Sequence, residues 1–145
     1  MPVTIYIYYQ IVIICMKSEY WLKRAQETRQ FAYKSDEVTY RVFKDDDSNP
    51  HPDEMGVWFG ENIFVSDKVP DPFRDMIAYH EWTEVKGMKE HGFPETGTLE
   101  GNRLLEMLHK KAVKKELELA SRRNVLSQYK EWCAEMDELY GPRVQ

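Results

Sequence analysis

Residues 76–90 read Met-Ile-Ala-Tyr-His-Glu-Trp-Thr-Glu-Val-Lys-Gly-Met-Lys-Glu, and the rest of the chain is interpreted around them. They are predicted to form a helix, in which positions i and i+4 share one face. His80 and Glu84 are four residues apart, so an imidazole and a carboxylate can point at one place. Zinc accepts both kinds of ligand. Glu81, about 100° further round the helix, is expected beside such a metal rather than on it.

Turn-forming residues mark the ends of this helix. Asp71 is expected to cap it, with Pro72 at the first position, where the missing N–H costs nothing. Gly92 is expected to end it. A loop of about seven residues follows, which makes the next helix an antiparallel neighbour. Thr98 is a candidate cap for that long helix, which either continues through residues 121–124 or breaks there.

The second helix supplies a third candidate ligand. His109 lies on its apolar side, among residues such as Leu105 and Leu108. Ala112, one turn further on, is small and would let the two helices approach closely. Glu116 follows His109 by seven residues and returns to nearly the same angle. We expect Glu116 to be either a fourth ligand or an acceptor that fixes the tautomer of a ligating histidine.

The two helices share a joint pattern, H-E-x-x-E from His80 and H-x-x-A-x-x-x-E from His109. This pattern resembles the zincin-type metallopeptidases, in which a strand precedes a helix bearing H-E-x-x-H and a third ligand comes from downstream. It is also similar to a group of small phage and microbial proteins with H-E-x-x-E followed by H-x-x-A-x-x-x-E. The resemblance covers about residues 60–116 and implies a zincin-like fold.

The resemblance implies a role for each matching residue. His80, Glu84 and His109 would hold zinc or another divalent metal, and Glu81 would be the general base. Zinc in such a site lowers the pKa of water and polarises a substrate carbonyl. The strand around residues 60–65 would be the edge along which a peptide or protein substrate lies. The ligand count is kept, but the peptidase signature is not, because a glutamate replaces the second histidine of the motif.

The leading hypothesis is therefore a zinc-dependent hydrolase acting on peptide or amide bonds. No oxyanion donor can be assigned, and Tyr79, His91 and Tyr129 are only possibilities. One alternative is a non-enzymatic interaction module with a structural metal or none. Another is a carboxylate-bridged metal-binding helical protein, because Glu106-x-x-His109 matches one of the two E-x-x-H units that di-iron bundles need.

The remaining pattern predicts an α+β fold. Residues 18–33 have the spacing of an amphipathic helix, and residues 36–44 alternate as a strand does. Residues 57–65 are expected to be a second strand, in which Gly60 marks a bulge or a close backbone approach. Residues 45–56 are expected to be a loop, with calcium binding as an alternative. The result would be a small antiparallel sheet of two or three strands packed on three or four helices.

Length and composition limit the number of domains and the class of protein. The 145 residues fit a single domain spanning 1–145, and the net charge of −5 argues against nucleic-acid binding. Cys15 and Cys133 form no metal-binding pair, which favours a reduced, cytoplasmic protein. Residues 3–15 are too short for a membrane span and lack signal-peptide features. They are expected to be either a buried strand or an upstream extension outside the core fold. The oligomeric state is not indicated.

Overall fold

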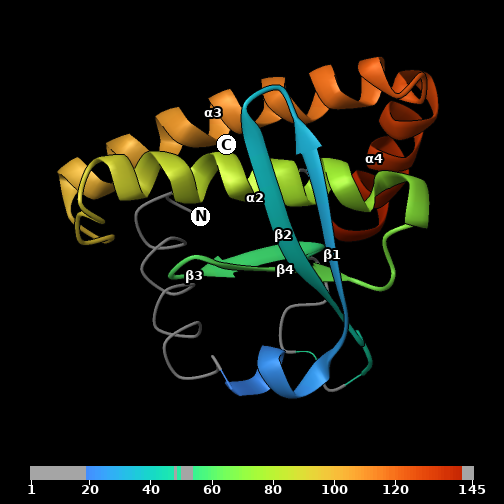
Figure 1. Cartoon of the computed structure of the whole chain (residues 1–145), viewed down its shortest axis with the longest axis horizontal. Helices are drawn as coiled ribbons and strands as arrows, with labels where there is room; N and C mark the ends of the chain where they lie inside the picture. The colour runs from blue at the N-terminus through green and yellow to red at the C-terminus, as the bar shows by residue number, and fades with distance from the viewer. Residues whose placement is uncertain (1–18, 48, 50–53, 142–145) are drawn as a thin grey trace.

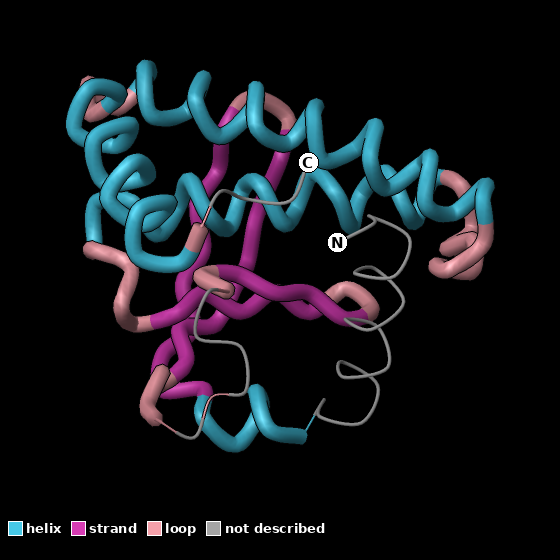
Figure 2. The backbone as a smooth tube through the Cα atoms, turned by 180° about the vertical axis from the view of Figure 1, so that it is seen from behind, coloured by secondary structure: helices cyan, strands magenta, loops and turns pink. Residues whose placement is uncertain are grey.

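A four-stranded mixed sheet lies against one helix, and further helices pack on that helix (Figures 1 and 2). The computed structural model describes residues 19–47, 49 and 54–141. Residues 19–24 are helical, and the other elements are β1 (Ala25–Tyr33), β2 (Asp36–Phe43), β3 (Gly56–Phe59), β4 (Asn62–Ser66), α2 (Asp71–Glu90), α3 (Leu99–Arg122) and α4 (Leu126–Tyr140). The predicted α+β class is confirmed.

The sheet has the order β1-β2-β4-β3, one strand more than expected. Both hairpins, β1–β2 and β3–β4, are antiparallel, whereas β2 and β4 pair in parallel. The extra strand arises because residues 57–65 do not form one strand. Gly60 has a φ of 55° and lies in the turn between β3 and β4. A bulge or close backbone approach there was the wrong prediction, because a Cβ added at Gly60 would meet no atom within 4 Å.

The prediction of a helix over residues 18–33 is wrong beyond residue 24. Residues from Ala25 onward pair with β2, and this long-range pairing overrides the local helical spacing. Phe31 and Tyr33 pack against the main core, and both rings make edge contacts with Tyr79. Residues 1–18 lie outside the described residues, so neither prediction for residues 3–15 is tested.

Asp45 begins the loop that was expected over residues 45–56, part of which lies outside the described residues. Its buried carboxylate accepts hydrogen bonds from Ser66 Oγ at 2.6 Å and from Asn49 Nδ2 at 2.8 Å. These bonds tie the start of the loop to the end of β4. The carboxylate therefore has a structural role in the sheet.

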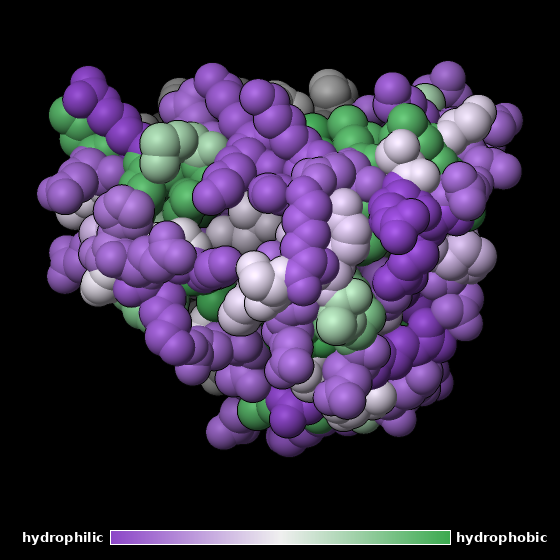
Figure 3. Space-filling view, turned by 45° about the horizontal axis from the view of Figure 1, so that its top comes forward, coloured by the Kyte–Doolittle hydropathy of each residue, from purple (hydrophilic) through white to green (hydrophobic). Residues whose placement is uncertain are grey.

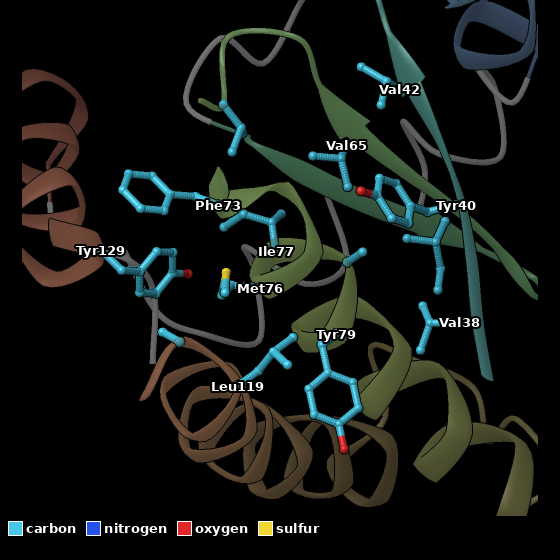
Figure 4. Close-up of a cluster of buried hydrophobic side chains, with 14 of the residues drawn as sticks. Val38, Tyr40, Val42, Val65, Phe73, Met76, Ile77, Tyr79, Leu119 and Tyr129 are labelled. Atoms are coloured by element: carbon cyan, nitrogen blue, oxygen red, sulfur yellow. The ribbon is translucent and has the colours of Figure 1, made fainter. Parts of the chain in front are cut away.

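The core lies between the sheet and α2 and extends to α3 and α4 (Figure 4). Val38 and Tyr40 of β2 and Val65 of β4 face Ile77 of α2, while Leu119 comes from α3. The outer side of α3 is polar. Figure 3, with α3 turned toward the viewer, shows a mainly hydrophilic surface with separate apolar patches. No helix in the described part of the chain has the length and apolar character needed to cross a bilayer.

The helix ends follow local signals closely. Gly92, at φ 72°, ends α2: its N–H bonds Lys89 O at 3.0 Å, and the next N–H bonds Met88 O at 2.8 Å. Thr98 caps α3 by accepting from the Gly101 N–H at 3.1 Å. The expected cap at Asp71 is wrong.

Asp71 is already the first helical residue of α2 and makes no side-chain cap bond. Its carboxylate instead pairs with Arg29 of β1 at 2.6 Å. At the far end of α3, the chain breaks at Asn124, which has a φ of 60°. Of the two possibilities for residues 121–124, a break between two helices is therefore observed.

Candidate metal centre

The close crossing of α2 and α3 positions the site. At Gly87 an added Cβ would lie 3.0 Å from Cγ of Leu108, so only a glycine lets α3 approach this closely without displacing that side chain. Ala112 is completely buried. The two helices are neighbours that run in opposite directions, as the short loop predicted (Figure 1). This crossing brings a histidine of α3 against the histidine and glutamate of α2.

His80, Glu84 and His109 form a group that can hold a metal ion. His80 Nε2 lies 3.2 Å from His109 Nδ1 and 3.4 Å from Glu84 Oε2, and His109 Nδ1 lies 3.0 Å from Glu84 Oε2. Donor atoms placed tetrahedrally about 2.0–2.1 Å from zinc are about 3.3 Å apart. The three donors are thus spaced as a tetrahedral site requires. His80 and Glu84 are only 5% and 7% exposed, so bulk water does not separate them.

Hydrogen bonds from residues outside the group determine which atoms of His80 and Glu84 face the metal position. Glu116 Oε1 lies 2.6 Å from His80 Nδ1, and the Tyr129 hydroxyl donates to the other oxygen of Glu116. When Nδ1 donates its proton to Glu116, the lone pair of Nε2 faces the group. Glu84 is held similarly, because the indole N–H of Trp58 donates to its Oε1 at 3.3 Å. Of the two roles expected for Glu116, its geometry is that of the acceptor.

Electrostatics within the group favour a cation. Burial disfavours a charged His80, but the carboxylate of Glu84 and the hydrogen bond to Glu116 outweigh it and raise the pKa of His80 well above its ordinary value. Burial likewise disfavours an ionised Glu84, but His80 and His109 together lower the pKa of Glu84 to about 2. A positive charge is therefore stabilised at the point where the three donors meet.

Glu81 lies beside the group and is only partly buried. Its side chain runs past the start of β3, where a Cβ added at Gly56 would lie 3.1 Å from Glu81 Cγ. The carboxyl group has no hydrogen-bond partner among the described residues. Burial and then the charge of Glu84 raise the pKa of Glu81 to about 8. A carboxylate whose pKa is raised binds a proton more strongly than an ordinary carboxylate does, which suits a general base.

The outer strand beside the site is not the one expected. Residues 60–65 were expected to form the substrate edge, but β4 lies between β2 and β3. The outer strand is β3, which carries Trp58. Sequence reasoning missed this tryptophan as a contact of Glu84. The local sequence carried no signal for it beyond an aromatic residue in a strand, because the contact depends on how β3 lies over α2.

Other candidate residues lie elsewhere. The Tyr79 hydroxyl donates to Asp36 at 2.9 Å, and the Tyr129 hydroxyl donates to Glu116, so each is engaged in a structural bond. His91 Nδ1 bonds the carbonyl of Gly87 at the end of α2. The described residues hold one potential metal group, and Glu106 is not in it. The geometry gives no support to a site built on Glu106-x-x-His109.

Comparison with known proteins gives no independent guide to this site. No family model, no curated protein and no solved structure matches the chain. The functional proposal therefore rests on the geometry and chemistry of the group His80, Glu84 and His109, together with the carboxyl group of Glu81.

Proposed function

We propose that this chain is a metal-dependent hydrolase that uses zinc and acts on peptide or amide bonds. One observation carries the proposal: His80, Glu84 and His109 place three donors 3.0–3.4 Å apart, next to the carboxyl group of Glu81, which has no hydrogen-bond partner in the described part of the chain. Two imidazoles and one carboxylate are the protein ligands of several catalytic zinc sites, which keep a fourth position open. The arrangement of an outer strand beside the ligand-bearing helix supports the resemblance to the zincin-type metallopeptidases.

Each residue has a defined part in this mechanism. When bound, zinc polarises the substrate carbonyl and lowers the pKa of water. Glu81 accepts a proton from the attacking water while the water oxygen forms a bond to the carbonyl carbon. Glu81 then returns the proton to the amine nitrogen as the carbon–nitrogen bond breaks. His80, Glu84 and His109 would hold the metal and exchange no proton with the substrate.

The donor set alone is compatible with other metals. Two histidines and one carboxylate also bind ferrous iron in oxygenases. Glu81 favours hydrolysis, because a carboxyl group whose pKa is raised to about 8 by burial is suited to moving a proton. Metal analysis of the purified protein distinguishes a zinc hydrolase from an iron oxygenase. Bound iron, together with a Glu81→Gln variant that behaves as wild type, would contradict the hydrolase proposal.

An extended peptide is the proposed substrate because of β3. This strand pairs with β4 on one side and has no strand on its other side among the described residues. A peptide that adds to a free strand edge is bound through main-chain hydrogen bonds. Gly56, at the start of β3, lies against the side chain of Glu81, so a peptide paired with this strand would pass close to the base.

The test uses two variants with matched controls on the same helix. His80→Ala is expected to lose the metal, whereas His91→Ala, at the exposed end of α2, retains it. Glu81→Gln is expected to retain the metal and lose at least about 100-fold in hydrolysis of casein or a peptide library. Glu90→Gln, which changes an exposed glutamate of α2, retains both. If wild type, His80→Ala and Glu81→Gln are all metal-free and equally stable, the protein is a non-catalytic module.

A further inference from the structure

Trp58 lies where the outer strand of the sheet meets the metal group. It belongs to β3, and its Nε1 is 3.3 Å from Oε1 of Glu84 on α2. The indole ring also packs against two separate core clusters, the main one and the cluster of Met88, Leu104 and Leu108. Packing against both clusters restricts the ring, so its N–H has a defined direction.

Because of the contact with Trp58, the two oxygens of the Glu84 carboxylate have different partners. Oε2 faces His109 Nδ1 at 3.0 Å and His80 Nε2 at 3.4 Å, whereas Oε1 accepts from the indole. An indole N–H is only a donor and cannot itself bind a metal. It therefore occupies one oxygen and leaves the other for the cation.

We propose that Trp58 is a positioning residue that holds Glu84 as a one-oxygen metal ligand. This inference rests on the proposed metal-dependent function and adds a residue that acts on the metal through Glu84. Without the N–H, the carboxylate can rotate and offer both oxygens or neither. Contacts of this kind around ligating residues typically change metal affinity by about 10–100-fold.

The first test replaces the tryptophan by a residue of similar packing. Trp58→Phe keeps an aromatic ring on β3 and removes the N–H, and it is expected to bind Zn²⁺ about tenfold more weakly than wild type. Trp82→Phe is the matched control, because Trp82 is also partly buried against the main core but makes no hydrogen bond to Glu84 within the described part of the chain. Its zinc affinity is expected to stay within about twofold of wild type. Thermal unfolding without metal shows whether both variants are folded.

Two further measurements distinguish a positioning role of Trp58 from a role in packing alone. With Co²⁺ in place of zinc, Trp58→Phe is expected to change the visible absorption bands, which report coordination geometry, whereas Trp82→Phe leaves them unchanged. In a Glu84→Gln background, Trp58→Phe is expected to cost less than about threefold, because the residue it acts through is already altered. A full tenfold loss in both backgrounds would assign Trp58 to packing alone.

The outcomes also distinguish this inference from the proposed function. If wild type binds zinc and Trp58→Phe has the same affinity and the same cobalt spectrum, Trp58 does not position Glu84 and the hydrolase proposal stands. If wild-type protein takes up neither metal, both proposals fail.

Discussion

Replacing Glu116 by glutamine tests whether a carboxylate behind His80 strengthens the metal site. Glu116 is 1% exposed, and its Oε1 lies 2.6 Å from His80 Nδ1. Glutamine has the same shape and keeps an oxygen that can accept from Nδ1, so packing changes little. The negative charge is lost, and an amide NH₂ replaces the second oxygen, so the Tyr129 hydroxyl becomes its acceptor instead of its donor. Any change in metal affinity then measures the effect of that charge on the histidine ligand.

The expected loss follows from the kind of hydrogen bond. A bond to a charged group contributes about 1.5–3 kcal/mol and a neutral one about 0.5–1.5 kcal/mol. Glu116→Gln is therefore expected to cost about 1–1.5 kcal/mol, which is roughly a tenfold weaker zinc affinity. Glu116 also helps to raise the pKa of His80 in the metal-free protein. Proton competition weakens zinc binding more in wild type than in the variant, so the difference between them should shrink as the pH falls.

Competition with a chromophoric chelator, between pH 6 and 8.5, measures this effect. Glu106→Gln is the matched control, since it makes the same charge change on α3 outside the metal group. It is expected to bind zinc as wild type does. Equal zinc affinities for Glu116→Gln and wild type would refute the reasoning, and so would an equal loss in Glu106→Gln.

Two further predictions concern stability. Without metal, stability should fall as the pH rises from 5 to 8, because the folded-state pKa values of His80 and Glu81 are raised, that of Glu81 to about 8, and the stability they contribute is lost as each deprotonates. Excess zinc should reverse the slope, and thermal unfolding with EDTA or zinc measures both; equal slopes would contradict a shared site. Gly87→Ala should lose about 1–2 kcal/mol in urea unfolding, because the added Cβ meets Leu108 and this cost exceeds the gain in helix propensity. It should also weaken zinc binding by moving His109 away, and unchanged affinity would show that the crossing does not set the site.

Local signals predicted the ends of α2 closely but not the state of residues 25–33. The limits of α2 were expected within one residue, because Pro72 and Gly92 act on the backbone next to them. Residues 25–33 were misassigned because their state depends on pairing with β2. Helical spacing was present there, but contacts of Phe31 and Tyr33 with the core decide the structure. Such long-range contacts cannot be predicted from the sequence of the segment alone.

The same distinction applies to the site. His80 and Glu84 are neighbours by helix geometry alone, and the short loop before α3 placed His109 near them. Gly87 was not recognised as the point of close approach, although a glycine inside a helix is a visible signal. The contact of Trp58 with Glu84 could not be predicted from the sequence, because it depends on the parallel pairing of β2 with β4, which makes β3 the outer strand. A strand order of this kind is a property of the whole fold.

The charges of the site argue for a cation more strongly than its motif does. Glu84 and Glu116 contact the imidazoles of His109 and His80 and are almost fully buried, and the carboxyl group of Glu81 interacts electrostatically with His80 and Glu84. Burying charged groups costs several kcal/mol per ion unless opposite charge compensates them. Without metal the compensation comes from protons, as the raised pKa values of His80 and Glu81 show. A divalent ion would replace these protons and supply the same positive charge at one point. A core that served only packing would gain stability from apolar residues here, so these buried charges support the proposed metal site.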